Sequence, residues 1–341
     1  MTTPVLICDD SGFARKQMAR SIPDGWDVSI SFAGNGQEAL DAIRAGKADV
    51  MFLDLNMPVM DGYETMKVIR EEDLPCLVIV VSGDVQPEAR ERMIGLGALD
   101  FIRKPIDNNK LVTLLEQYGI YSGAGSAENR RHETDLSGAA SKDDQLDAYR
   151  ELVNVAMGRA GENLAKLLGE FIDLPIPNVN LIESNELHMA IAEINHNERV
   201  SAVSKGFVSA GINGEALVIF NDTNADNIVQ LLKYKTQQSG HHLQLEALMD
   251  VSNILIGACL NALSTQLNVQ FSHSHPILLG RHRGLDVLLS DNISRWGKIM
   301  AVEIAYAIKA RDISFDLLLL FPDDSMEKIY TRLVEDGEDD A

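Results

Sequence analysis

The sequence predicts an α/β fold over residues 1–119, followed by an α+β region that contains an internal duplication. Two observations lead to this prediction. Short apolar runs alternate with amphipathic helical stretches in the first third of the chain, and one polar pattern recurs at a fixed offset in the remainder. A length of 341 residues is typical of two or three domains.

Five apolar runs in the first region lack polar alternation, which is typical of strands that are buried on both faces of a parallel sheet. Helical periodicity marks the stretches between them, such as Gly36–Arg44, Tyr63–Arg70 and Pro87–Ile94, and a last helix is expected over Asn108–Tyr118. Five successive strand–helix units predict a five-stranded parallel sheet with helices on both faces. The expected strands are Val5–Cys8, Val28–Phe32, Val50–Leu53, Leu77–Val81 and Leu99–Ile102.

The composition changes at residues 120–145, which are rich in Ser, Gly, Ala and charge and predict a flexible linker. A second domain is expected over residues 146–335, and the acidic tail at 336–341 is expected to be disordered. Helices are predicted over Leu146–Leu168, Asp226–Lys233, Leu243–Leu267 and Asp324–Leu333. Strands are predicted over Met189–Ile194, Arg199–Ser209, Glu215–Phe220, Gly284–Leu289, Lys298–Ile308 and Ser314–Phe321, with a hairpin turn at Asn213-Gly214.

The chain is strongly acidic, with 51 acidic and 30 basic residues and a formal net charge of -21. Binding to nucleic acid requires clustered Lys and Arg, which the sequence lacks, so the charge argues against a transcriptional output and against an anionic membrane surface. The amino-terminal residues do not resemble a signal peptide, and no apolar run approaches the roughly 20 residues that span a bilayer. We therefore expect a cytoplasmic protein.

Carboxylate, hydroxyl and amine groups lie at the ends of four predicted strands. Asp9 and Asp10 follow the first strand, Asp54 the third, Ser82 the fourth and Lys104 the fifth. The carboxyl ends of parallel strands meet at one edge of a sheet, so these side chains should converge. Clustered carboxylates favour a hard cation such as Mg²⁺. Asp54 could then serve as a nucleophile that forms an acyl phosphate, with Lys104 and Ser82 binding phosphate oxygens.

This set, together with the LDLNMPVMDG stretch at 53–62 and the Lys104-Pro105 pair, resembles the receiver domain of two-component response regulators. The resemblance is greatest to CheY-like chemotaxis regulators and covers residues 1–119. It implies a flavodoxin-like fold in which a histidine kinase is the phosphodonor and Asp54 accepts the phosphoryl group.

The same resemblance implies the ligands of a bound Mg²⁺. Asp10 and Asp54 would bind the metal directly, Asp9 would assist, and the backbone carbonyl of Asn56 would add a further ligand. Phe101 lies where the family carries a Tyr or Phe that moves inward on phosphorylation.

An acidic residue, an asparagine three positions later and a proline 23 positions after that asparagine occur twice in the second region. The copies are Glu151, Asn154 and Pro177, and, 99 positions later for all three, Asp250, Asn253 and Pro276. Such a recurrence indicates a duplicated structural unit. Residues three apart share one face of a helix, and apolar residues occupy the other side, so each acid–asparagine pair is expected on an exposed face. A solvated polar face without a function is the alternative interpretation.

The repeated pattern resembles the signature of the CheC/CheX/FliY family of phosphatases, over roughly residues 146–335. The resemblance implies that each acid, Glu151 or Asp250, pairs with the active-site lysine of a phosphorylated CheY-like receiver. The adjacent Asn154 or Asn253 would position a water that attacks the aspartyl phosphate, and the substrate receiver would supply the Mg²⁺. Asp250 departs from the glutamate that is usual in the family.

Two functions remain open from the sequence. The first is an aspartyl-phosphate phosphatase that is regulated by its own receiver domain. The second is a non-catalytic adaptor whose receiver controls binding of a CheD-like deamidase or another signalling partner. In the first case, Asp54 is either the switch of an enzyme that removes the same modification elsewhere or a substrate of its own chain.

Overall fold

The computed structural model describes residues 2–121, 142–187, 200–221, 225–232, 241–279 and 296–339. The chain divides into two compact units, Met1–Glu151 and Leu152–Ala341. The boundary lies within one long helix, α6 (Lys142–Leu168), whose first ten residues belong to the first unit.

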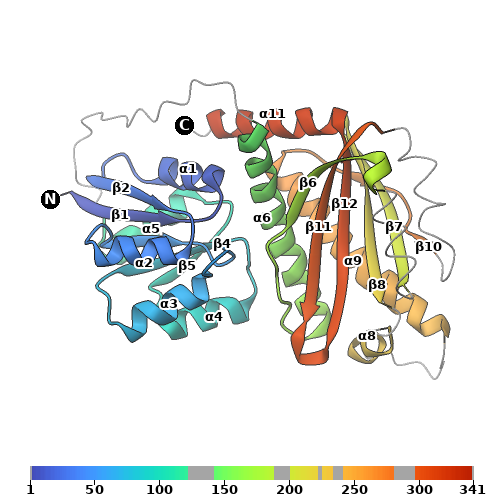
Figure 1. Ribbon diagram of the computed structural model, residues 1–341, viewed down its shortest axis with the longest axis horizontal. Coiled ribbons are helices and arrows are strands. Elements are labelled where there is room, and N and C mark those ends of the chain that lie inside the picture. Colours follow the sequence, from blue (N-terminus) through green and yellow to red (C-terminus); the bar gives the residue numbers. More distant parts are fainter. Residues whose placement is uncertain are drawn as a thin grey trace. The chain divides into compact units, whose positions relative to one another are not determined.

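The first unit contains a five-stranded parallel sheet in the order β2-β1-β3-β4-β5, with helices on both faces (Figure 1). This arrangement confirms the predicted α/β fold. Its strands are β1 (Thr3–Cys8), β2 (Val28–Ala33), β3 (Val50–Leu53), β4 (Leu77–Ser82) and β5 (Asp100–Arg103). Its helices are α1 (Gly12–Ser21), α2 (Gly36–Arg44), α3 (Gly62–Glu71), α4 (Pro87–Leu96) and α5 (Asn108–Gln117), besides the start of α6.

Polar residues at the strand–helix junctions start the helices beside the carboxyl edge of the sheet. The side chain of Ser11 accepts a hydrogen bond from the backbone at the start of α1, and Asn35 does the same for α2. Asp61 and Glu64 form a capping box at the start of α3. These contacts satisfy amide groups that a helix leaves unpaired, and they fix where each helix begins relative to the strand before it.

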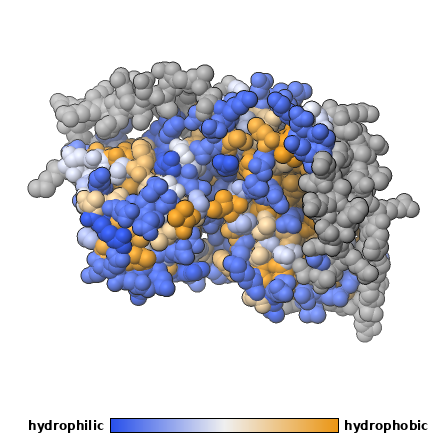
Figure 2. All heavy atoms as spheres, viewed as in Figure 1, coloured by the Kyte–Doolittle hydropathy of each residue, from blue (hydrophilic) through white to orange (hydrophobic). Residues whose placement is uncertain are grey.

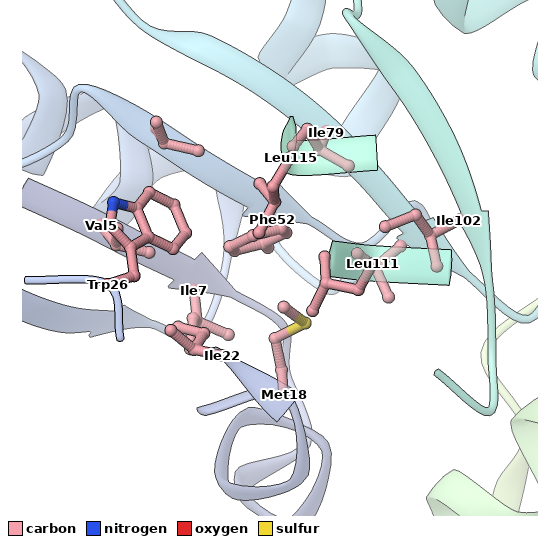
Figure 3. Packing of buried hydrophobic residues seen from close by; sticks show 12 residues of the cluster. Val5, Ile7, Met18, Ile22, Trp26, Phe52, Ile79, Ile102, Leu111 and Leu115 are labelled. Carbon is pink, nitrogen blue, oxygen red and sulfur yellow. The ribbon is translucent and has the colours of Figure 1, made fainter. Parts of the chain in front are cut away.

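A cluster of apolar side chains fills the space between the sheet and the helices α1 and α5. Phe52 of β3 lies among side chains from several elements, including Met18 of α1 and Leu111 of α5 (Figure 3). Leu111 and Leu115 are fully buried, one helical turn apart. This packing holds the strands in register, so the residues that follow them are placed on a rigid frame.

The second unit contains a seven-stranded sheet whose strand pairs are all antiparallel. The strand order is β10-β7-β8-β12-β11-β6, and β9 pairs with β7. The strands are β6 (Asn178–Glu183), β7 (Val200–Ser209), β8 (Ile212–Asn221), β9 (Ser272–His273), β10 (Ile277–Leu279), β11 (Lys298–Ile308) and β12 (Ile313–Pro322). The helices after α6 are α8 (Ala225–Leu232), α9 (His241–Gln266) and α11 (Asp323–Asp339).

The internal duplication is visible in the order of these elements. Each half reads long helix, edge strand, hairpin and helix, and the strand order from one edge, β10-β7-β8, matches β6-β11-β12 from the other. The long helices α6 and α9 begin 99 residues apart, as do the edge strands β6 and β10. The structure thereby confirms the α+β fold with an internal duplication.

The two faces of this sheet differ in what they contact. On one face, Tyr306 of β11 contacts α6, because its hydroxyl donates to the carbonyl of Met157 at 3.4 Å. The opposite face carries an apolar cluster that includes Ala202, Leu217 and Ile299. Figure 2 shows hydrophobic residues gathered over the strands of this sheet in the view drawn.

The hairpin of β7 and β8 is present, but its turn lies at Ala210-Gly211 and not at Asn213-Gly214, where the sequence predicted it. Ala210 and Gly211 have φ values of 44° and 83°, the positive angles that a tight two-residue hairpin turn requires. Gly214 lies inside β8 instead. Its missing side chain makes room there for the Phe207 ring and for the Leu320 carbonyl.

Several predicted elements differ from the observed ones in where they begin or end, or were not predicted at all. The helix predicted from Leu146 begins at Lys142, and α11 continues to Asp339 through most of the tail that was expected to be disordered. The strands β6 and β10, at the two edges of the sheet, were not predicted from the sequence. Predicted strands at 189–194 and 284–289 lie outside the described residues, as does most of the predicted linker.

The expectation that no segment is long and apolar enough to span a membrane was wrong for α9. Among the described residues, His242–Gln266 meets that criterion by length and composition. Within its most apolar window, 61% of the helix is buried inside the protein. The same composition is typical of a helix at the core of a globular domain.

We predict that Gly214→Ala destabilises the protein by about 2–4 kcal/mol, because the added methyl group would lie 2.5 Å from the Leu320 carbonyl oxygen and would also clash with Phe207. Gly257→Ala in α9 is the matched control. Its methyl group meets nothing within 4 Å, and alanine favours the helix. Chemical denaturation measures both variants, and equal stability of the two would contradict the packing described for Gly214.

Candidate functional site

A buried polar pocket lies at the carboxyl ends of the strands in the first unit. Asp9 follows β1, Asp54 follows β3, Ser82 ends β4 and Lys104 follows β5. All four are buried, with Asp54 only 1% exposed and Lys104 only 5% exposed. The parallel topology therefore brings together charged groups that are up to 95 residues apart in the sequence.

The Lys104 ammonium group is the centre of this pocket. Its Nζ donates to Asp9 Oδ2 at 2.6 Å and lies 3.1 Å from Asp54 Oδ1. A third carboxylate reaches it from α6, because Glu151 Oε1 lies 3.1 Å from the same nitrogen. Glu151 is the last residue of the first unit and is itself 5% exposed. One buried lysine is thus shared by three acidic side chains.

Backbone amides orient the two receiver carboxylates. Asp9 Oδ1 accepts from the Ser11 amide at 2.9 Å, and Asp54 Oδ2 accepts from the Asn56 amide at 2.9 Å. Asp54 Oδ1 is within ion-pair distance of Lys104 but has no hydrogen-bond partner. This oxygen is therefore available to a further group.

The buried charges change the acidity of the pocket. Burial raises the pKa of Asp54 to about 8; Lys104 opposes the increase, and the charges of Asp9, Glu151 and Asp10 add to it. Burial likewise raises the pKa of Glu151 to about 7, against the opposing effect of Lys104. Burial alone would lower the pKa of Lys104, but Asp54, Asp9 and Glu151 outweigh it and hold that pKa well above the ordinary value. The carboxylates are only partly neutralised by one lysine.

The predicted metal ligands follow β1 and β3, at the carboxyl edge of the sheet. Asp10 is half-buried, and burial followed by the charge of Asp9 raises its pKa to about 6. No group of three or more His, Cys, Asp and Glu side chains is arranged to hold a metal ion within the described ranges. The donor set nevertheless has the chemistry that Mg²⁺ favours, because it consists of carboxylate oxygens with an excess of negative charge.

The remaining predicted receiver residues surround this centre. Ser82 Oγ accepts a hydrogen bond from the Asp84 amide at 3.1 Å, which orients the hydroxyl at the end of β4. Phe101 is half-buried in β5, and its amide donates to the side chain of Asp100 at 2.7 Å.

The sequence interpretation missed the contribution of the first turns of α6. Asp147 Oδ2 accepts a hydrogen bond from the Phe13 amide at 2.7 Å, and Asp144 lies 3.8 Å from Lys16 at an exposed position. Asp147 precedes Glu151 by four residues, so both lie on one face of the helix. That spacing was visible in the sequence. Nothing in the sequence indicated that the partner of Asp147 lies on α1 or that the partner of Glu151 follows β5.

The expected exposure of the acid–asparagine pairs was correct only for the second copy. Glu151 and Asn154 are buried, at 5% and 8% exposed, whereas Asp250 is exposed and Asn253 is half-buried. Glu151 is buried because it enters the pocket around Lys104.

The two asparagines have different surroundings. The side-chain oxygen of Asn154 is buried and has no hydrogen-bond partner. The side-chain oxygen of Asn253 accepts from Lys205 Nζ at 3.3 Å. The two copies of the pattern are therefore not equivalent in their contacts.

Comparison with known proteins supports the interpretation of the first unit. Residues 5–116 match the family model described as the response regulator receiver domain. A protein-glutamate methylesterase/protein-glutamine glutaminase from Syntrophomonas wolfei is 32% identical over 168 residues, which is 46% of this chain and 48% of that protein. A protein of the same name from Bacillus licheniformis is 39% identical over 135 residues, which is 37% of this chain and 38% of that protein. The chain thus spans less than half the length of these relatives.

Among solved structures, FliY from Thermotoga maritima resembles 58% of this chain and 99% of its own, with 17% identity and a TM-score of 0.44. A CheX–CheY–BeF₃–Mg²⁺ complex from Borrelia burgdorferi covers 35% of this chain and 90% of the matched chain, with 30% identity and a TM-score of 0.32. The family match and the geometry of the first unit agree on one conclusion. Residues 5–116 form a response regulator receiver domain.

Proposed function

We propose that this protein is a cytoplasmic chemotaxis signalling protein in which a receiver, phosphorylated at Asp54 by a histidine kinase, regulates a phosphatase domain. That domain hydrolyses the aspartyl phosphate of CheY-like response regulators. One observation supports the proposal most strongly. Glu151, the acid of the first acid–asparagine pair, lies 3.1 Å from Lys104, the lysine of a receiver pocket. The same pairing would let the acid recognise the equivalent lysine of a substrate receiver.

The asparagine has the chemistry that the hydrolysis requires. An amide side chain can accept and donate hydrogen bonds at once, so it can hold a water in a defined orientation. The Asn154 oxygen is buried without a partner, and an oriented water would satisfy it. The water oxygen would form a bond to phosphorus while the bond between phosphorus and the aspartyl oxygen breaks. The carboxylate leaves, and the protons of the water pass to phosphate and solvent. Catalysis would consist mainly of positioning.

In the receiver of this chain, Asp9, Asp10, Asp54 and the Asn56 carbonyl would hold the Mg²⁺. When bound, the metal would neutralise the developing charge on the phosphoryl oxygens. Asp54 would be the nucleophile, and its Oδ1, which has no hydrogen-bond partner, would be the reacting oxygen. Lys104 and Ser82 would contact the phosphoryl oxygens, with Phe101 reporting the change to the receiver surface.

Competition for Lys104 provides a mechanism of regulation. Lys104 lies 3.1 Å from both Asp54 Oδ1 and Glu151 Oε1. A phosphoryl group on Asp54 would carry about -1.5 to -2 charge next to this ammonium group, in place of the single charge of the free carboxylate. The phosphoryl oxygens would then replace the Glu151 carboxylate as partner of Lys104. Phosphorylation would thereby release the first acid–asparagine pair.

A non-catalytic adaptor is the second candidate. Asp250 is one methylene shorter than the glutamate at the same position of the first copy, and it is exposed. An exposed acidic helix face could bind a CheD-like deamidase or another signalling partner. Binding that survives loss of both asparagines, without phosphate release, would favour this function.

Phosphate release from a separately purified, phosphorylated CheY-like receiver tests the phosphatase function. We expect the double variant Asn154→Ala/Asn253→Ala to lower the rate on the order of 10²-fold, the effect of removing a positioned polar group from a reaction centre. Asn261→Ala, at an exposed position of α9, is the matched control and should keep the wild-type rate. A double variant as fast as the control would exclude the phosphatase function.

Competition for Lys104 is tested by the rate at which Asp54 becomes phosphorylated. Glu151→Gln removes one of the three carboxylates around Lys104, so we expect phosphorylation of Asp54 by acetyl phosphate to become several-fold faster. Initial rates of phosphoryl incorporation measure this step before any hydrolysis contributes. Glu162→Gln, which alters a carboxylate paired with Lys166 on the same helix, should leave the rate unchanged. Equal rates in both variants would show that Glu151 does not compete for Lys104.

A further inference from the structure

A buried lysine lies beside the second acid–asparagine pair. Lys205 of β7 is 5% exposed, and its Nζ lies 3.3 Å from Asn253 Oδ1. Within the part of the chain that the structure describes, no carboxylate forms an ion pair with it, and burial lowers its pKa. A buried ammonium group without a counter-charge lowers the stability of a fold. Its presence here is therefore difficult to explain by stability alone.

The duplication provides an internal comparison for this lysine. The position 99 residues later is Ile304, fully buried in β11. Ile304 precedes Tyr306 by two residues, so both point to the face of the sheet that contacts α6. The first half thus has a lysine where the second half has an apolar residue. In agreement, the Asn154 oxygen has no partner, whereas the Asn253 oxygen has one.

The contact determines how Asn253 presents its amide group. Because Lys205 donates to Oδ1, the amide oxygen is held toward β7 and the NH₂ group is directed away from it. Oδ1 retains a second lone pair that can accept from a water. A positive charge next to the oxygen also strengthens the NH₂ group as a donor. Asp250, one helical turn earlier on the same face, is exposed to an incoming partner.

The two acids also differ in exposure. Glu151 is buried and bound to Lys104 within the first unit, whereas Asp250 is exposed. We propose that Lys205 is a positioning residue that orients Asn253, and that the second pair is the site that acts on the phosphorylated receiver of another protein molecule. This inference rests on the phosphatase function proposed above. In the reaction, a water oxygen bonds to phosphorus, the bond between phosphorus and the aspartyl oxygen breaks, and the carboxylate is released.

The test uses the full chain with the first pair disabled by Glu151→Gln/Asn154→Ala. The probe is a purified CheY-like receiver that has been phosphorylated with acetyl phosphate, and kcat and KM for phosphate release are measured. We expect Lys205→Met to lower kcat about tenfold or more, the effect of about 1.4 kcal/mol in the transition state, while KM stays unchanged and the melting temperature does not fall. Ile304→Met, the matched change in the other half, should leave kcat unchanged. Lys205→Arg should recover part of the lost rate because it keeps the charge and the donor.

The possible outcomes separate this inference from the proposed function. An unchanged kcat in Lys205→Met, or an equal loss of kcat and melting temperature without rescue by arginine, overturns the role of Lys205. If release in the disabled background equals spontaneous hydrolysis of the substrate and Asn253→Ala has no effect, the second pair is not a site and the inference is overturned. The phosphatase function itself is judged separately, by the rate of the wild-type chain against its double asparagine variant.

Discussion

The sharing of one buried ammonium group by three carboxylates is the interaction on which the first unit depends. Lys104 contacts Asp9, Asp54 and Glu151, and each of these side chains comes from a different element. Buried charges are tolerated only when they are paired, so the strand ends and helix caps must place all four groups accurately. The parallel sheet provides this accuracy because its carboxyl ends meet at one edge. The remaining imbalance of charge is the property that makes the pocket responsive to a cation or a phosphoryl group.

The duplicated unit shows how two copies of one pattern can come to differ. The strand order reads the same from both edges of the sheet, and the long helices carry their acids and asparagines at equivalent positions. One acid is buried against a lysine of the first unit, and the other is exposed. One asparagine lacks a partner for its oxygen, and the other is held by Lys205. A division of roles between the two copies follows from these contacts more directly than from the sequence pattern.

The fold was largely predictable because its signals are local. Apolar runs without alternation indicated each buried strand of the first sheet, and the 99-residue offset indicated the duplication. Edge strands such as β6 escaped prediction because polar residues interrupt their apolar pattern. The hairpin turn was placed three residues too late because Asn213-Gly214 is a strong turn signal, whereas the positive φ angles belong to Ala210-Gly211. Here close packing against Phe207 explains the glycine at 214 better than turn geometry does.

The residues of the candidate site could be predicted from the sequence, but some of the contacts between them could not. Strand-end positions indicated Asp54 and Lys104, whereas nothing local indicated that Glu151 would be buried, because its partner lies 47 residues earlier in the chain. Lys205 was missed for the same reason, since its partner Asn253 lies 48 residues later.

The most direct test of regulation by the receiver is the rate of phosphate release from a phosphorylated CheY-like receiver by the wild-type chain and by Asp54→Asn, each with and without a phosphodonor. We expect the phosphodonor to change the rate of the wild type and not that of Asp54→Asn. An identical response of the two proteins would contradict regulation through Asp54.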